Sequence, residues 1–214
     1  MTLPTRGHSQ QSSDPAEPST RRKGRPLSAL PALHVRALES LDMTVDEVRE
    51  DQWASPTPCE EWDVRQLLGH LTREALWVPH LLRGETLEEV GDRYEGDVLG
   101  QDPQGSWLRA SAAERATVTA PDAIDGSVHT SMGEMESEEY LAQRLTDLVV
   151  HRWDLAKAIG GDTSLDPEAA EMLYEKWAER ADMLAGSGMF AEPVPVPDDA
   201  DGGTKLLALL GRRV

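Results

Sequence analysis

The chain has 214 residues and a net charge of −18, from 21 Lys and Arg residues against 39 Asp and Glu residues. This length suits one domain with a tail, because domains average roughly 100 to 200 residues. Nucleic acids and anionic membranes bind clusters of Lys and Arg, so the charge argues against both as partners. The single cysteine, Cys59, excludes a disulfide framework and a four-cysteine zinc site.

Neither a membrane span nor an export signal is visible. The longest apolar run, Leu206 to Leu210, is much shorter than the roughly 20 residues that span a bilayer. The N-terminal segment also lacks an apolar stretch of signal-peptide length. We therefore expect a cytoplasmic protein.

Charge and composition divide the chain near residue 27. Residues 1–27 hold five basic and two acidic residues, a net charge of +3, which leaves −21 on residues 28–214. The first segment is rich in Ser, Pro and Gln, a composition typical of disorder. We predict a disordered basic tail over 1–27 and one folded domain over 28–214. The RRKGR cluster of the tail contacts an acidic partner or the acidic domain of the same chain, or it has no separate function, and the composition favours the last interpretation.

In the first half of the domain, apolar residues recur every three or four positions, as on one face of an α-helix. They predict a first helix at about 32–50. After the turn SPTPCEEW, Asp63 and Gln66 have the spacing of a capping box for a second helix, which ends at Gly84. Pro79 removes one hydrogen bond inside that helix and predicts a kink.

The second half continues the helical pattern. A weaker helix is predicted at 107–118, followed by a loop, with room for a short hairpin, in PDAIDGSVHTSMGEME. Ser137 is expected to cap a helix that ends at Ile159, and Asp166 to cap a last long helix to about Leu184. Four amphipathic helices of bundle length predict an all-α fold, an antiparallel four-helix bundle. The prolines of PVPVPDDADGG predict an extended C-terminal segment, with a short turn of helix after it.

Three side chains able to bind a metal share one ridge of the helix predicted at 137–159. At 100° per residue, Asp147, His151 and Asp154 lie together beside its apolar stripe. Asp147 and His151 are four residues apart, so their side chains lie one turn apart and can reach one ion. On the second helix His70 flanks the apolar stripe, and in an antiparallel bundle it can face this ridge.

A site of His70, Asp147 and His151 would have two nitrogen ligands, one carboxylate and at least one open position, as in a catalytic zinc site. The spacing alone is weakly specific, because a His beside an apolar stripe is more often a hydrogen-bonded core residue. Glu74, one turn beyond His70, is either a further ligand or, more simply, part of a surface charge pair with Arg73. Asp154 either orients a ligand histidine or pairs with an exposed charge.

Three separated stretches resemble a known family: SPTPCEEWDVRQLLGHLTREALW, LTDLVVHRWDLAKAIGGDTSLDPE, and GMFAEPVPVPDDAD with LLALLGR. Over about Leu33 to Arg212 the chain is similar to actinobacterial metal-binding proteins related to mycothiol-dependent maleylpyruvate isomerase, of the DinB/YfiT-like superfamily. The resemblance implies a four-helix bundle that binds one divalent metal, usually zinc, through His70, Asp147 and His151. The isomerase pattern has Glu where this sequence has Asp147, so the metal must lie closer to that helix or be reached through water.

The resemblance also implies mycothiol as a thiol cosubstrate at the open metal position. A divalent cation lowers the pKa of a bound thiol and holds it as the nucleophilic thiolate. The isomerase resembles this bundle with a further C-terminal domain, whereas this sequence ends soon after LLALLGRRV, so we do not transfer its reaction. Our hypothesis is a zinc- and mycothiol-dependent S-transferase or isomerase-like enzyme acting on a small electrophile, as a monomer or homodimer. The alternatives are a metal-binding sensor or interaction module without catalysis, and a metal-dependent hydrolase.

Two further predictions concern residues near these motifs. Cys59 lies in a turn with no His nearby in sequence, which favours a small buried residue over a nucleophile. The tryptophans Trp62, Trp77 and Trp153 lie beside the motif helices and are predicted to pack around the site.

Overall fold

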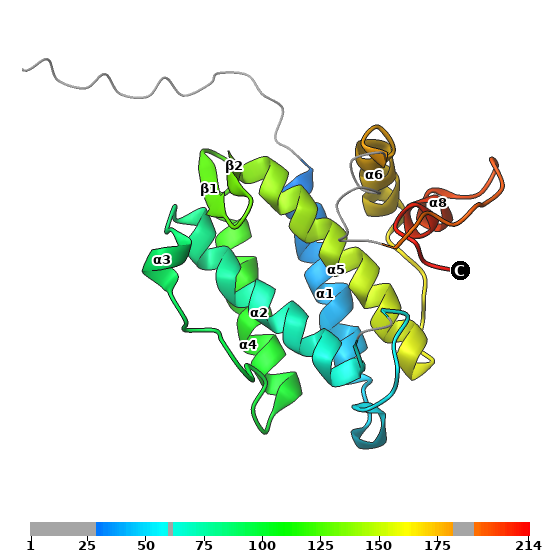
Figure 1. Cartoon of the computed structure of the whole chain (residues 1–214), viewed down its shortest axis with the longest axis horizontal. Coiled ribbons are helices and arrows are strands. Elements are labelled where there is room, and N and C mark those ends of the chain that lie inside the picture. Colours follow the sequence, from blue (N-terminus) through cyan, green and yellow to red (C-terminus); the bar gives the residue numbers. More distant parts are fainter. Residues whose placement is uncertain (1–28, 60–61, 182–190) are drawn as a thin grey trace, which may run out of the picture.

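The computed structural model describes residues 29–59, 62–181 and 191–214, so the tail predicted at 1–27 lies outside it. This part of the chain is mostly helical, with one two-stranded antiparallel hairpin (Figure 1). The elements in chain order are α1 (Leu30–Asp46), a 3-10 helix η1 (Glu50–Gln52), α2 (Val64–Leu82), α3 (Leu87–Val90), α4 (Pro103–Val118), β1 (Ser127–Thr130), β2 (Gly133–Glu136), α5 (Ser137–Ile159), α6 (Pro167–Ala178) and α8 (Gly202–Leu209).

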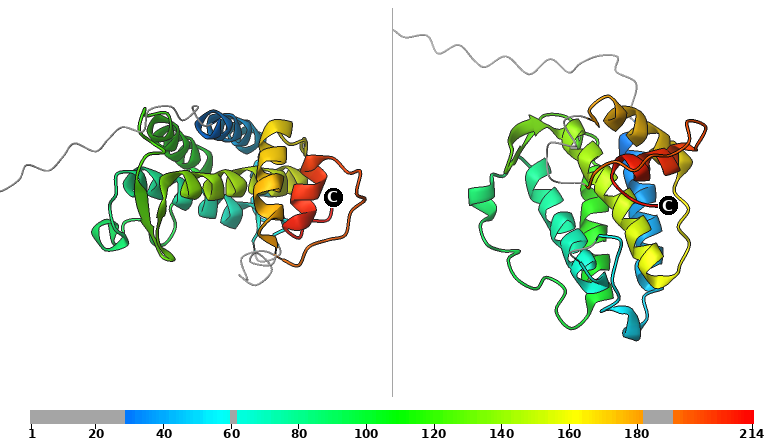
Figure 2. Two further views of the ribbon diagram at one scale, coloured as in Figure 1. Left: turned by 90° about the horizontal axis from the view of Figure 1, so that it is seen from above. Right: turned by 45° about the vertical axis from the view of Figure 1, so that its right-hand side comes forward.

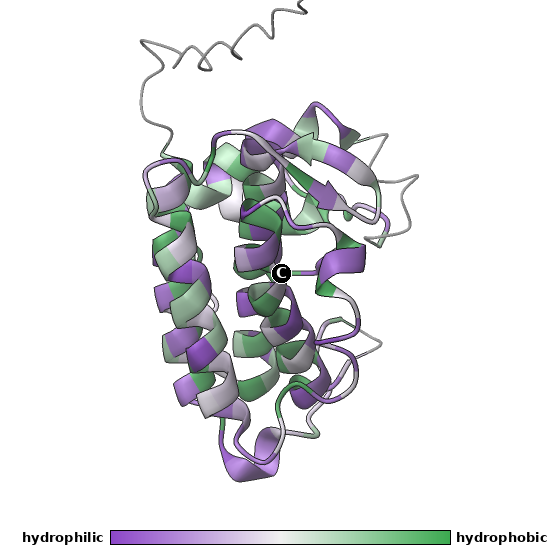
Figure 3. Cartoon of the chain, turned by 90° about the vertical axis from the view of Figure 1, so that its left-hand side faces the viewer, coloured by the Kyte–Doolittle hydropathy of each residue, from purple (hydrophilic) through white to green (hydrophobic). Residues whose placement is uncertain are grey.

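Four helices, α1, α2, α4 and α5, pack side by side around one apolar core. α1 contacts α4 and α5, and α2 contacts the same two helices. The α1–α4 pair is antiparallel, because Gln104 at the start of α4 donates to the carbonyl of Val45 at the end of α1. In Figure 1, α1 and α5 run in one direction and α2 and α4 in the other, so the α2–α5 pair is antiparallel as well, whereas the neighbouring pairs α1–α5 and α2–α4 are parallel. The predicted antiparallel arrangement therefore holds for only two of these four pairs. Figure 3 shows polar and apolar residues alternating along these helices.

The weak helical pattern at 107–118 proves to be α4, a full member of this group. Its buried face contains Ser111 and Glu114 as well as Trp107 and Val118. Two polar residues on the inner face dilute the apolar periodicity, which explains why the sequence shows this helix only weakly. α6 packs instead on α5 and α8, beside the group (Figure 2). It ends at Ala178, before the predicted Leu184, which is outside the described residues.

Local capping signals place two helix starts where the sequence predicts them. The Asp63 carboxylate accepts from the backbone N–H of Gln66 at 2.8 Å, and the Gln66 side chain accepts from the Asp63 N–H at 3.0 Å. At α6, Asp166 accepts from the backbone N–H groups of Glu168 and Ala169. These bonds satisfy N–H groups that have no partner inside the helix.

The start of α5 differs from the prediction that Ser137 is its cap. Ser137 is the first helical residue, and Glu136 precedes it without a side-chain cap bond. The chain enters α5 directly from β2, so the Ser137 N–H donates to the carbonyl of Gly126, before β1. The hairpin that the sequence allowed at this point therefore replaces the side-chain cap.

The C-terminal part runs without helix or strand over 191–201 and then forms α8, which is longer than the predicted turn. Asp201 caps this helix by accepting from the Thr204 N–H at 3.0 Å. Within the described ranges, none of the helices is long and apolar enough to span a membrane. The domain boundary at residue 28 stays a prediction.

Candidate metal centre

The antiparallel contact between α2 and α5 brings together all three side chains that the sequence singled out. One ligand atom from each of His70, Asp147 and His151 lies within 4.8 Å of the others. The Nε2 atom of His70 is 3.1 Å from Oδ1 of Asp147. The Nε2 atom of His151 is 3.2 Å from the same oxygen. Two imidazole nitrogens and one carboxylate oxygen therefore converge on one point between the helices.

This geometry fits a zinc ion. A tetrahedral zinc with bonds of roughly 2.0–2.1 Å separates neighbouring ligand atoms by about 3.4 Å. The Nε2–Oδ1 distances of 3.1 and 3.2 Å are close to that value. The shorter Asp147 side chain thus reaches both histidines directly. The side chains of His70, Asp147 and His151 remain 26%, 24% and 11% exposed, so the point of convergence is accessible from solvent.

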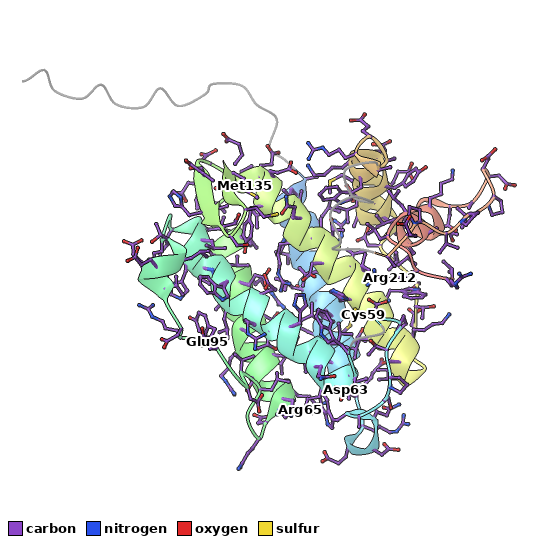
Figure 4. The ribbon with its side chains drawn as sticks, in the orientation of Figure 1. Cys59, Asp63, Arg65, Glu95, Met135 and Arg212 are labelled. Atoms are coloured by element: carbon purple, nitrogen blue, oxygen red, sulfur yellow. The ribbon has the colours of Figure 1, made fainter. Side chains whose placement is uncertain are left out.

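The orientation of His151 is held from its other ring nitrogen. Its Nδ1 lies 2.9 Å from Oδ2 of Asp154, a carboxylate with no exposed surface. Of the two roles that the sequence left open for Asp154, this contact fits that of a partner to His151, a candidate ligand. Arg212 donates to Asp154 through Nη2 at 2.8 Å and through Nε at 3.3 Å, a contact that the sequence did not predict. Figure 4 shows Arg212, which belongs to the C-terminal segment, beside α5.

Aromatic rings pack against the two histidines. The Trp62 ring stacks on His70 with 4.6 Å between ring centroids, and the His70 and His151 rings meet edge to face at 5.3 Å. Of the three tryptophans predicted near the site, Trp62 lies against a candidate ligand. Trp77 instead packs edge-on against Tyr94.

Arg144 holds the free oxygen of Asp147. Its Nη1 donates to Asp147 Oδ2 at 2.5 Å, and its Nη2 donates to the carbonyl of Leu71, next to His70, at 3.2 Å. The same guanidinium forms two 3.0 Å bonds with the carboxylate of Glu114, which also receives a 2.6 Å bond from His34. Arg144, Glu114 and His34 are buried. The Asp147 carboxylate is thereby turned so that Oδ1 faces the histidines.

These contacts shift the pKa values of the candidate ligands. Burial alone would raise the pKa of Asp147, but His151 and His70 outweigh it and hold that pKa well below its usual range. Burial lowers the pKa of His151, but the carboxylates of Asp147 and Asp154 raise it to about 9. Burial and the nearby Asp147 charge raise the pKa of Glu74, one turn beyond His70. The carboxylates of Asp147 and Asp154 thus favour the protonated imidazole of His151, and a metal bound at its Nε2 would have to displace the proton there.

A pocket of about 320 Å³ opens beside His70, between α2 and the loop before α4. Arg65 and Arg73 fasten this loop to α2. Arg65 donates to Asp97 and to the carbonyl of Gly100, both at 2.8 Å, and Arg73 donates to the carbonyls of residues 94 and 96. The lining is formed by Trp62, Arg65, Gln66, Gly69, His70, Arg73, Gly96, Asp97, Val98 and Leu99.

The other residues considered as candidates do not contribute to the group of His70, Asp147 and His151. His80 is bonded to Glu85 at 2.7 Å and to the Tyr94 hydroxyl at 2.8 Å, so it faces away from the site. Cys59 is half-buried in the turn before α2. The predicted surface charge pair of Arg73 with Glu74 is replaced by the bonds of Arg73 to loop carbonyls.

Comparison with known proteins shows which family the chain belongs to. The family model described as "Mycothiol maleylpyruvate isomerase N-terminal domain" matches residues 34–156, more than half of the chain. The chain belongs to this family. The matched range contains all three candidate ligands, whereas Arg212 lies beyond it. The resemblance of the sequence motifs to the mycothiol-dependent maleylpyruvate isomerase family is confirmed.

Relatives of the chain include two proteins of Mycobacterium tuberculosis. Uncharacterized protein MT0763 of strain CDC 1551 / Oshkosh and uncharacterized protein Rv0738 of strain ATCC 25618 / H37Rv are each 31% identical over 188 residues. The match covers 85% of this chain and 96% of each relative.

Two crystal structures have a similar fold. They are those of the mycothiol-dependent maleylpyruvate isomerase and of a histidine-to-alanine mutant of it. Both have a TM-score of 0.54, sequence identities of 17% and 16%, and coverage of 73% of both chains. At this identity the likeness shows a shared fold.

Proposed function

We propose that this member of the mycothiol maleylpyruvate isomerase N-terminal domain family binds one zinc ion through His70, Asp147 and His151. The observation that carries the proposal is the convergence of two Nε2 atoms on Oδ1 of Asp147, at 3.1 and 3.2 Å. The contacts around the three side chains support it. Each of Asp147 and His151 is held from behind by a buried partner, Arg144 and Asp154 respectively. Such outer contacts orient metal ligands in proteins.

We further propose that the bound metal serves thiol chemistry with mycothiol. A divalent cation lowers the pKa of a coordinated thiol, so the sulfur is available as a thiolate at neutral pH. Membership of the family supports mycothiol as the thiol. The pocket beside His70, whose lining includes two arginines, offers space for a polar cosubstrate. Such a thiolate would serve S-transfer by displacing a leaving group, with its electron pair, from an electrophilic carbon. It would equally serve isomerisation by adding to an activated double bond, which allows rotation about the resulting single bond before the thiolate is eliminated again.

The chain's own residues prepare this site. Arg144 fixes which oxygen of Asp147 faces the metal position. Asp154 accepts a hydrogen bond from the Nδ1–H of His151, and Nε2 is left turned toward Asp147. The Trp62 ring covers one face of His70 and limits the access of water from that side.

Hydrolysis is a second candidate function, because of Glu74. This carboxyl lies one turn from His70, and burial and the nearby Asp147 charge raise its pKa, which is the direction that favours a general base. A hydrolase would turn over esters or amides without added thiol. A thiol transferase would require mycothiol for every turnover.

The experiment is a set of conjugation assays with zinc-loaded protein, mycothiol and a panel of small electrophiles. We expect mycothiol to bind and to be conjugated with at least one electrophile, and the activity to be lost in His151→Ala. The matched control is His80→Ala, since His80 lies on α2 but is bonded to Glu85 and Tyr94. Zinc-loaded protein that neither binds mycothiol nor conjugates any electrophile refutes the thiol chemistry. The cytoplasmic location and the monomeric or dimeric state stay predictions.

A further inference from the structure

The turn after α8 has a geometry that only glycine allows. The Gly211 N–H donates to the carbonyl of Ala208 at 3.1 Å, and the Arg212 N–H donates to that of Leu207 at 2.8 Å. These two bonds are a Schellman motif, which requires a left-handed residue after the helix. Gly211 has φ +82°, and a Cβ atom there would lie 2.6 Å from Cβ of Ala191. The sequence Gly-Arg thus ends α8 and fixes the direction in which Arg212 leaves it.

Arg212 points inward and grips a buried carboxylate. It is only 9% exposed, although it is the third residue from the end of the sequence. Its Nη2 and Nε donate to the two oxygens of Asp154, and its Nη1 donates to the carbonyl of Leu210 at 2.8 Å. A guanidinium that binds both oxygens of one carboxylate fixes the plane as well as the position of that carboxylate.

The carboxylate held in this way is the partner of a candidate metal ligand. Asp154 Oδ2 lies 2.9 Å from Nδ1 of His151, and the Nε2 of the same ring lies 3.2 Å from Asp147. A carboxylate that accepts from Nδ1 sets the tautomer and the tilt of a metal-binding imidazole. An unbroken series of hydrogen bonds therefore links the C-terminal turn to the metal position.

We infer that Arg212 is a positioning residue of the metal centre, acting on His151 through Asp154. The inference rests on the proposed metal site. The docking of α8 and of the turn that follows it is then part of the construction of the centre, even though these residues lie outside the range that defines the family. When Arg212 is absent, Asp154 is free to rotate in its buried setting, and the ring of His151 loses its fixed orientation.

The test compares zinc affinities, measured by competition with a chromogenic chelator, across matched variants of the full chain. For Arg212→Gln we expect affinity to fall about tenfold, as for other outer partners of metal ligands. Arg212→Lys, which keeps the charge and loses the fork, should lose less. The control is Arg213→Gln, because Arg213 is the next residue and is exposed; its affinity should equal that of wild type. Arg212 and Asp154 act on His151 through the same contact, that between Asp154 and the imidazole. A double variant with Arg212→Gln and Asp154→Asn should therefore lose little more zinc affinity than Asp154→Asn alone.

A second readout separates positioning from general stability. In the metal-free protein, the Nδ1 proton of His151 should exchange slowly with water, and NMR should show it exchanging faster in Arg212→Gln and not in Arg213→Gln. Arg212→Gln protein that melts at a lower temperature but keeps wild-type zinc affinity and a protected Nδ1 proton overturns the inference. Wild-type protein that binds no zinc overturns the proposed function and, with it, any role of Arg212 in a metal centre; exchange of the Nδ1 proton then still shows whether Arg212 fixes His151 through Asp154.

Discussion

Replacing Arg144 by methionine should destabilise the fold strongly. Arg144 forms two 3.0 Å bonds to Glu114 and further bonds to Asp147 and to the carbonyl of Leu71. Both Arg144 and Glu114 are buried, so Arg144→Met leaves a charged carboxylate in the core with His34 as its remaining partner. Removal of one member of a buried pair costs about 3–5 kcal/mol. We expect the free energy of unfolding of the metal-free protein to fall by about that amount.

The assay is urea denaturation followed by tryptophan fluorescence, with the slope compared between variants to confirm that the same surface is exposed on unfolding. The matched control is Arg36→Met, because Arg36 pairs with Asp166 and Glu168 at the surface. Exposed ion pairs contribute little, so the midpoint of the control should stay near that of wild type. An Arg144→Met protein that unfolds at the same urea concentration as the control would contradict the account of this buried network.

The remaining predictions concern the buried carboxylate of Glu114 and the turn at Gly211. Burial raises the pKa of Glu114, but Arg144 and His34 outweigh burial and lower that pKa from 4.5 to about 2. The contribution of the Glu114 carboxylate to the stability of the fold should therefore be complete above pH 4.5 and decrease as the pH falls toward 2. Glu114→Gln should flatten this acid dependence in urea titrations at successive pH values, and an unchanged dependence would show that other carboxylates cause it. Gly211→Ala should lower stability by at least about 1 kcal/mol, because the left-handed backbone disfavours a side chain and the new Cβ meets Ala191. Gly96→Ala, with a similar φ of +75° but open space, isolates the backbone contribution and should cost less in the same thermal unfolding experiment.

The parts of the fold that follow from local sequence could be predicted. The capping box of α2 and the Asp166 cap of α6 join residues two or three positions apart, so their signals are complete within a few letters of sequence. The ridge of Asp147, His151 and Asp154 follows from helical periodicity alone. The same periodicity made His70 a candidate on α2, but no local pattern connects it to α5, and the resemblance to the family then favoured the set of three.

The contacts that support the site could not be predicted, because they join distant segments. Glu114 is 80 residues from His34 and 30 from Arg144, and Arg212 is 58 residues from Asp154. Each is a charged residue that would ordinarily lie at the surface, and only the packing of the helices makes it an interior partner. For the same reason the sequence underrated α4, whose inner face carries the charge of Glu114.

The central claim is that His70, Asp147 and His151 hold one metal ion. The most direct test is the zinc content and zinc affinity of wild type, His70→Ala, Asp147→Ala and His151→Ala, measured by elemental analysis and isothermal titration calorimetry. The account predicts one zinc per wild-type chain, a large loss of affinity in each of the three variants, and wild-type affinity in His80→Ala. Equal zinc binding by wild type and all three variants would contradict it.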